Sequence, residues 1–149
     1  MPTRDLTLNS LDDAIAEITR LRDSGYTSTA NWNLSQTCEH LTGTMRIGLD
    51  GSVPRLPWIQ RKVFGAMFRF LIWRRSMPRG AGTLPELVPN ERAEDDPALI
   101  ETCLATLAES RDFPGPLKPY PLMDGMTLEM WKELMTIHAQ HHLRLLEPK

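Results

Sequence analysis

Three of the chain's four histidines, His138, His141 and His142, lie within five residues of one another. The segment 127–146 around them predicts a helix, because Thr127 can cap its start and no proline or glycine interrupts it. Side chains four residues apart are neighbours on one helix face, so the imidazoles of His138 and His142 can converge on a single point. This is the geometry that a divalent metal needs. His141 is rotated off this face.

The fourth histidine, His40, lies far earlier in the chain, in a second helix predicted over residues 34–49. Asn33 or Ser35 can cap this helix, and His40 lies at the edge of its apolar stripe. If the two helices pack side by side, His40 completes a three-histidine site with the later pair. Such a site leaves coordination positions for water or substrate, and open positions are typical of reactive metal sites.

These patches resemble a known family. A tryptophan, Trp32, a helix start with the tripeptide EHL, and a threonine-capped final helix carrying H-x-x-H-H are similar to the DinB/YfiT-like superfamily of metal-dependent enzymes. That family is a four-helix bundle whose metal is held by one histidine of the second helix and an H-x-x-x-H pair of the last. The resemblance implies His40, His138 and His142 as ligands, and His141 as a histidine that is usually not a ligand.

The resemblance also implies an activity of hydrolase or thiol S-transferase type on a small molecule, with a low-molecular-weight thiol as one candidate substrate. The commonest family ending has Arg-Gly-Gln after the double histidine, where this chain has Leu143, Arg144 and Leu145. No general base is identifiable in the sequence. A non-catalytic bundle that binds a metal or a small ligand therefore stays open as the alternative.

The ligand types favour a borderline metal. Neutral imidazoles suit Zn, Ni, Fe or Cu, and the lack of clustered carboxylates argues against Ca and Mg, so we expect Zn or Ni. A zincin is excluded, because its motif needs glutamate after the first histidine and Ala139 stands there. Further residues are candidates, from position alone, to orient ligands or line a pocket: His141, Gln36, Glu39 and Tyr120. Trp32 either staples the bundle, which is the favoured interpretation, or lines the site.

Composition indicates an ordinary globular protein of one domain, residues 1–149. With 17 Lys and Arg against 19 Asp and Glu, no overall positive field would hold nucleic acid or an anionic membrane. Cys38 and Cys103 both fall on apolar helix positions and are expected to be buried thiols in a reducing compartment. The start of the sequence shows no apolar run like a signal peptide, so we expect a cytoplasmic location.

The pattern predicts an all-α fold with four core helices and one additional helix. Unequal connections between them favour a crossover topology. The core helices are expected near 10–24, 34–49, 97–111 and 127–146, and the additional helix over 57–73.

The 57–73 segment carries apolar residues on more than one face and only positive charges. Arg69 interrupts its apolar run, so a transmembrane span is not expected. A helix of this kind needs burial on two sides, which predicts a homodimer or a folded-over lid, and the helix is also a candidate wall of the metal pocket. The irregular stretch 74–96 that follows either covers a site or wraps the surface without a chemical role.

Overall fold

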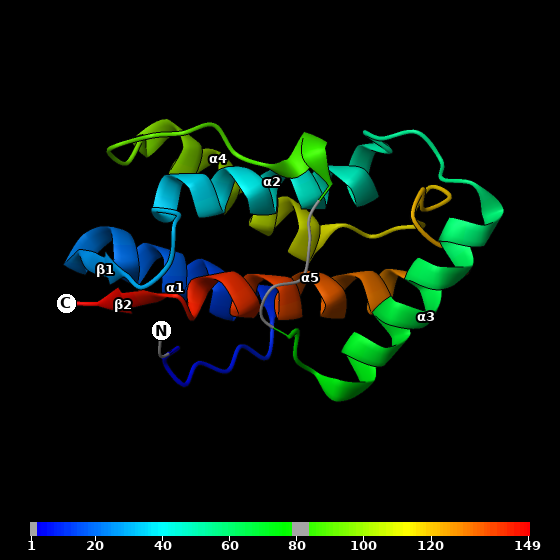
Figure 1. Ribbon diagram of the computed structural model, residues 1–149, viewed down its shortest axis with the longest axis horizontal. Helices are drawn as coiled ribbons and strands as arrows, with labels where there is room; N and C mark the ends of the chain where they lie inside the picture. Colours follow the sequence, from blue (N-terminus) through cyan, green and yellow to red (C-terminus); the bar gives the residue numbers. More distant parts are fainter. Residues whose placement is uncertain (1–2, 79–83) are drawn as a thin grey trace.

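The computed structural model describes residues 3–78 and 84–149, and this part of the chain is mostly helical (Figure 1). The expected all-α class is confirmed. Residues 79–83, inside the irregular stretch, lie outside the described residues. The elements in chain order are α1 (Leu11–Ser24), β1 (Tyr26–Ser28), α2 (Leu34–Asp50), α3 (Trp58–Arg74), the short 3-10 helix η1 (Pro85–Leu87), α4 (Pro97–Asp112), α5 (Leu128–Leu143) and β2 (Leu146–Pro148).

The helix starts lie where the capping residues predict them. The Ser10 hydroxyl accepts the Asp13 N–H at 3.2 Å at the start of α1. At the start of α2, Asn33 and Gln36 form a reciprocal capping box. The Thr127 hydroxyl accepts a backbone N–H in the first turn of α5. Each cap satisfies an N–H that has no partner within its own helix.

The expected end of the last helix is wrong. Helix α5 stops at Leu143, three residues short of the predicted 146, and the chain then enters β2. Strand β2 pairs antiparallel with β1, with Thr27 opposite Glu147, and the Thr29 N–H donates to the Leu145 carbonyl at 2.8 Å. The segment between α1 and α2 thus supplies a strand that pairs with the end of the chain. Pairing between distant segments overrides the local helix signal here.

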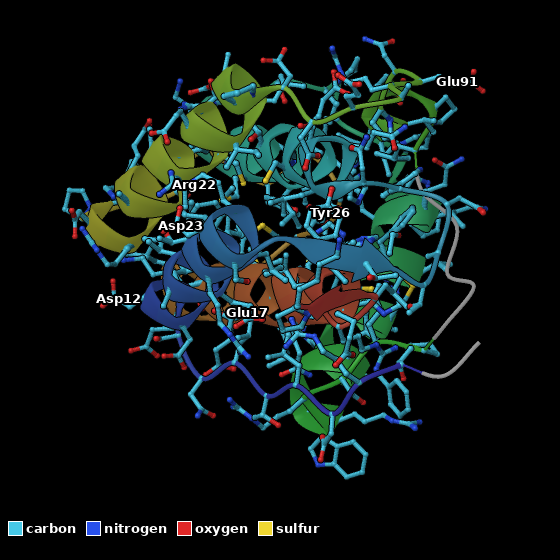
Figure 2. The ribbon with its side chains drawn as sticks, turned by 90° about the vertical axis from the view of Figure 1, so that its left-hand side faces the viewer. Asp12, Glu17, Arg22, Asp23, Tyr26 and Glu91 are labelled. Atoms are coloured by element: carbon cyan, nitrogen blue, oxygen red, sulfur yellow. The ribbon has the colours of Figure 1, made fainter. Side chains whose placement is uncertain are left out.

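Helices α1, α2, α4 and α5 surround the core: α4 packs on α1 and α2, and α5 packs on the same two helices (Figure 1). Cys38 of α2 and Cys103 of α4 are both fully buried and lie within hydrogen-bond contact of each other, as expected for buried thiols. Tyr26, the first residue of β1 and labelled in Figure 2, joins the start of α2 to the segment just before α4. Its hydroxyl donates to Asp95 at 2.7 Å and accepts the Leu34 N–H at 2.8 Å.

Helix α3 lies across the end of this core and packs against the first part of α5 (Figure 1). Gly65, Phe68 and Leu71 face inward and are buried. The opposite face of α3 is apolar and stays exposed to solvent. The helix is therefore not buried on two sides, as the expected folded-over lid would require. Among the described residues, no helix is long and apolar enough to cross a lipid bilayer.

Close contact between α2 and α5 generates a stability prediction. A Cβ at Gly48 would lie 2.2 Å from Trp131 Nε1, and Trp131 is fully buried. We expect Gly48→Ala to lower the free energy of unfolding by about 2 kcal/mol or more, although alanine is the better helix former.

The matched control is Gly65→Ala in α3. Its Cβ would meet the flexible end of Arg69 at 3.2 Å and Met123 Cβ at 3.5 Å. Urea unfolding followed by circular dichroism should place this control within about 1 kcal/mol of the wild type. Equal stability of both variants would contradict the close approach of α2 to Trp131.

Candidate metal centre

Three histidines from two helices meet between α2 and α5. The Nε2 atom of His138 lies 3.0 Å from Nε2 of His40 and 3.0 Å from Nε2 of His142. The three ligand atoms all lie within 4.8 Å of one another, close enough to hold one metal ion. The ring centroids form a nearly equilateral triangle with sides of 4.6, 4.7 and 4.8 Å. The structure therefore brings together the three histidines that the sequence singled out.

The helix pattern explains this placement. His138 and His142 are one helical turn apart on the inward face of α5, and they follow the buried Trp131 and Met135 along this face. His40 is 2% exposed in α2, directly across from them. His142 keeps partial solvent exposure, whereas His40 and His138 are buried.

A backbone carbonyl fixes the orientation of His40. Its Nδ1 lies 2.8 Å from the Leu87 carbonyl, in η1. A carbonyl oxygen can only accept, so Nδ1 carries the proton and a neutral His40 presents a bare Nε2 to the other rings. The irregular stretch 74–96 thus does contribute to the site, through main chain that no side-chain motif could reveal.

Gln36 and Glu39 act on the site indirectly. Gln36 Nε2 donates to the Asn90 carbonyl at 3.1 Å, and Glu39 Oε2 accepts the Asn90 N–H at 3.0 Å. Asn33 adds a third bond, from its side-chain amide to the Arg92 carbonyl at 3.1 Å. These bonds hold residues 90–92 against α2, just beyond the Leu87 carbonyl. The two candidates from the sequence are therefore anchors of the supporting loop.

Trp32 forms a wall of the site. Its ring stacks on His142, with centroids 5.4 Å apart and planes 22° apart, and tilts toward His40 at 5.1 Å. The Ser28 hydroxyl, at the end of β1, donates to the Trp32 carbonyl at 2.7 Å. Since β1 is itself paired with β2, the end of the chain helps to hold this aromatic wall in place.

The two remaining candidates have other surroundings. His141 is buried and its ring lies 4.9 Å from that of His142, while its Nδ1 lies 3.1 Å from the Arg144 guanidinium. Tyr120 is buried against Phe68 of α3, with ring centroids 6.5 Å apart. No contact among the described residues joins Tyr120 to the three histidines, so the structure gives it no part in the site.

Burial keeps the three imidazoles neutral. It lowers the pKa of His40, against the opposing effect of the Leu87 hydrogen bond. It lowers the pKa of His138 well below the usual value, helped by the neighbouring His142 and His40. Burial is also the main cause that lowers the pKa of His142 to about 2, with added repulsion from His40, His141 and Arg144. Metals bind neutral imidazole, so these shifts favour the binding form.

The donor set fits a metal better than it fits a hydrogen-bonded cluster. The Nε2 atom of His138 faces the Nε2 atoms of His40 and His142. A neutral His138 carries at most one proton on this atom. In a metal-free cluster, either two acceptors share that proton or two nitrogen lone pairs face each other. Ligand nitrogens of a tetrahedral zinc, at about 2.0–2.1 Å from the ion, stand about 3.3 Å apart, close to the two 3.0 Å separations here. Among the described residues, no Asp, Glu or Cys joins the three histidines as a further ligand.

Comparison with known proteins places the chain in a family. One family profile, described as a protein of unknown function (DUF1569), matches residues 1–149. The chain belongs to the DUF1569 family. Neither a curated protein nor a solved structure matches this DUF1569 chain. Its function must therefore be argued from the site.

The lowered histidine pKa values predict that the metal-free protein loses stability in mild acid. Below pH ~6.5 the unfolded chain binds protons at these histidines while the folded chain does not, so the free energy of unfolding falls as the pH falls. His142, whose pKa falls to about 2, contributes a loss of about 1.4 kcal/mol between pH ~7.5 and ~5.5, and the lowered pKa values of His40 and His138 act in the same direction.

Urea unfolding in the presence of a chelator, at both pH values, measures this loss. Other groups titrate in the same range, so the comparison is with His142→Gln, which removes one of the three histidines at the half-buried position. This variant should lose less stability than the wild type over the same pH interval. An identical loss in the two proteins would show that the folded-state pKa of His142 is not lowered.

Proposed function

We propose that this DUF1569 protein is a metal-dependent enzyme of hydrolase or thiol S-transferase type that acts on a small molecule. The observation that supports this most is the convergence of three neutral imidazoles on one point, with His142 partly exposed to solvent. Catalytic metal sites typically have three protein ligands and room for a further ligand, whereas structural metal sites are closed. In this proposal the further position lies beside His142, next to the ring of Trp32.

We also propose that α1, α2, α4 and α5 form a DinB/YfiT-like four-helix bundle with a crossover connection. One histidine comes from the second helix and two, at i and i+4, from the last helix, which is the order that the resemblance to that superfamily implies. Helix α3 is then an addition to this bundle. This assignment rests on the ligand order and on the helix packing alone.

Zinc or nickel is the metal we propose, because both accept imidazole ligands readily. When bound, such an ion supplies a Lewis acid that favours the deprotonated form of a thiol or water nucleophile near neutral pH. The chain's own residues supply the rest. Leu87 keeps the Nε2 atom of His40 free to bind, burial keeps His138 unprotonated, and Trp32 offers a flat apolar wall beside the further ligand position.

A non-catalytic metal-binding or small-ligand-binding role is the second candidate. Among the described residues, no Asp or Glu carboxylate is grouped with the three histidines, and this favours the non-catalytic role. General base catalysis needs a proton acceptor within about 3 Å of the reacting group. Among the described residues, His141 is an ionisable side chain beside a ligand ring, with its ring centroid 4.9 Å from that of His142.

Cobalt substitution tests the proposal. We expect the tag-free protein to bind one Co²⁺ with the visible absorption of a four- or five-coordinate ion, and a small thiol such as 2-mercaptoethanol to add a thiolate-to-cobalt charge-transfer band. The band should be absent from His138→Ala, which lacks the central ligand, and retained in His141→Ala, a matched change one turn away. A thiol band indicates an open position that accepts the S-transferase type of substrate.

Turnover separates the two candidates. Zinc- or nickel-loaded protein should hydrolyse activated small esters or amides, or transfer a small thiol to an electrophile, faster than the His138→Ala protein does. Metal binding without a spectral response to any exchangeable ligand, and without turnover, would favour the non-catalytic role. Failure of the wild type to bind cobalt, zinc or nickel would contradict the metal-dependent enzyme and leave only the small-ligand-binding form of the second candidate.

A further inference from the structure

Helix α3 presents a solvent-facing surface of large apolar side chains. Its inner face is occupied, since Gly65, Phe68 and Leu71 pack against the core. Its outer residues remain open although hydrophobic. The exposed fractions are 60% for Trp58, 58% for Ile59, 65% for Val63, 41% for Met67, 50% for Phe70 and 79% for Trp73.

This surface is large for a monomer. Aromatic side chains hold about 150–250 Å² each, so Trp58, Phe70 and Trp73 alone present on the order of 400 Å² at their exposed fractions. Adding Ile59, Val63 and Met67 takes the patch beyond the roughly 300–600 Å² that is the largest apolar patch of a typical monomer. It approaches the ~800 Å² that each partner buries in a stable interface of standard size.

The spacing of the outer residues points to a helix as the partner. Ile59, Val63, Ala66, Phe70 and Trp73, which we call the α3 seam, follow one another at spacings of four, three, four and three, and all five are exposed. This is the repeat by which one helix interdigitates with another.

We propose that the α3 seam pairs with the α3 seam of a second copy, antiparallel, about a two-fold axis that passes near Ala66. Ala66 is the middle residue of the seam and the smallest, so it allows the two helices to approach closely at their crossing. In this arrangement Ile59 faces the partner's Trp73, and Val63 faces the partner's Phe70. Each pair sets a smaller side chain against a larger one, as close packing requires.

The charges of α3 give this dimer a distinctive salt dependence. The helix carries no Asp or Glu, and Lys62 and Arg69 lie along one edge of the seam. In the antiparallel pair this edge meets its own copy, so like charges face each other, and added salt should screen them and strengthen the dimer. Binding of the same face to an anionic lipid surface would show the opposite response, because salt weakens attraction between opposite charges.

Sedimentation equilibrium of the full chain tests the proposal at low and at high salt. We expect a reversible dimer whose dissociation constant falls as salt rises. Ala66→Arg should raise this constant by about 100-fold or more, because it places two long cationic side chains at the crossing. Gln60→Arg is the control: it adds the same residue to an exposed position of the same helix, outside the seam.

A cysteine scan tests the axis itself. A residue near a two-fold axis can form a disulfide with its own copy, so Ala66→Cys should give a disulfide-linked dimer under mild oxidation, and Gln60→Cys should not. The native Cys38 and Cys103 are fully buried and should not react. Circular dichroism of each variant is the check that it is folded.

Three results would each overturn the proposal. The first is a wild-type protein that stays monomeric at all salt concentrations. The second is a dimer that survives Ala66→Arg unchanged or cross-links equally well through residue 60. The third is a monomer that sediments with vesicles of phosphatidylserine and phosphatidylcholine and is released by salt, which would assign the face to an anionic lipid surface instead.

Discussion

The meeting of three imidazoles between α2 and α5 is the interaction on which the rest of the structure depends. Buried imidazoles must be neutral and correctly oriented, and their ring nitrogens need partners. Different parts of the chain meet these requirements. The α5 spacing aligns His138 and His142, and the packing of α5 on α2 brings His40 to them. The Leu87 carbonyl sets the proton of His40. The β1–β2 pairing helps to hold Trp32 against His142.

Much of the fold and the identity of the three histidines could be predicted from the sequence. Local signals were sufficient for the helices, because Ser10, Asn33 and Thr127 are caps whose hydrogen bonds involve only nearby backbone. The convergence of His138 and His142 follows from helical geometry within one element. Bringing His40 to them requires knowledge of which helices pack together, and here the resemblance to a family, rather than the local pattern, indicated the pairing.

The remaining features depend on contacts between distant segments. The role of Leu87 belongs to its backbone carbonyl, which carries no signature in the side-chain sequence. The strand Leu146–Pro148 forms because Tyr26–Ser28 lies alongside it, so the helix predicted to 146 ends early. Tyr120 is a candidate on chain position alone, and the structure places it beside Phe68 of α3. Position along the chain is a poor guide between α4 and α5, where four prolines, at 114, 116, 119 and 121, restrict the direction of the backbone.

Metal content of the wild type and of single histidine variants, purified without a histidine tag, tests the central claim most directly. The account predicts up to one transition metal ion per wild-type chain, and strong loss of metal from His40→Ala, His138→Ala and His142→Ala, because two histidines hold an ion poorly. It predicts that His141→Ala keeps its metal. Full metal in His40→Ala together with loss in His141→Ala would contradict the ligand assignment. A wild type that takes up neither zinc nor nickel on titration would contradict the metal site itself.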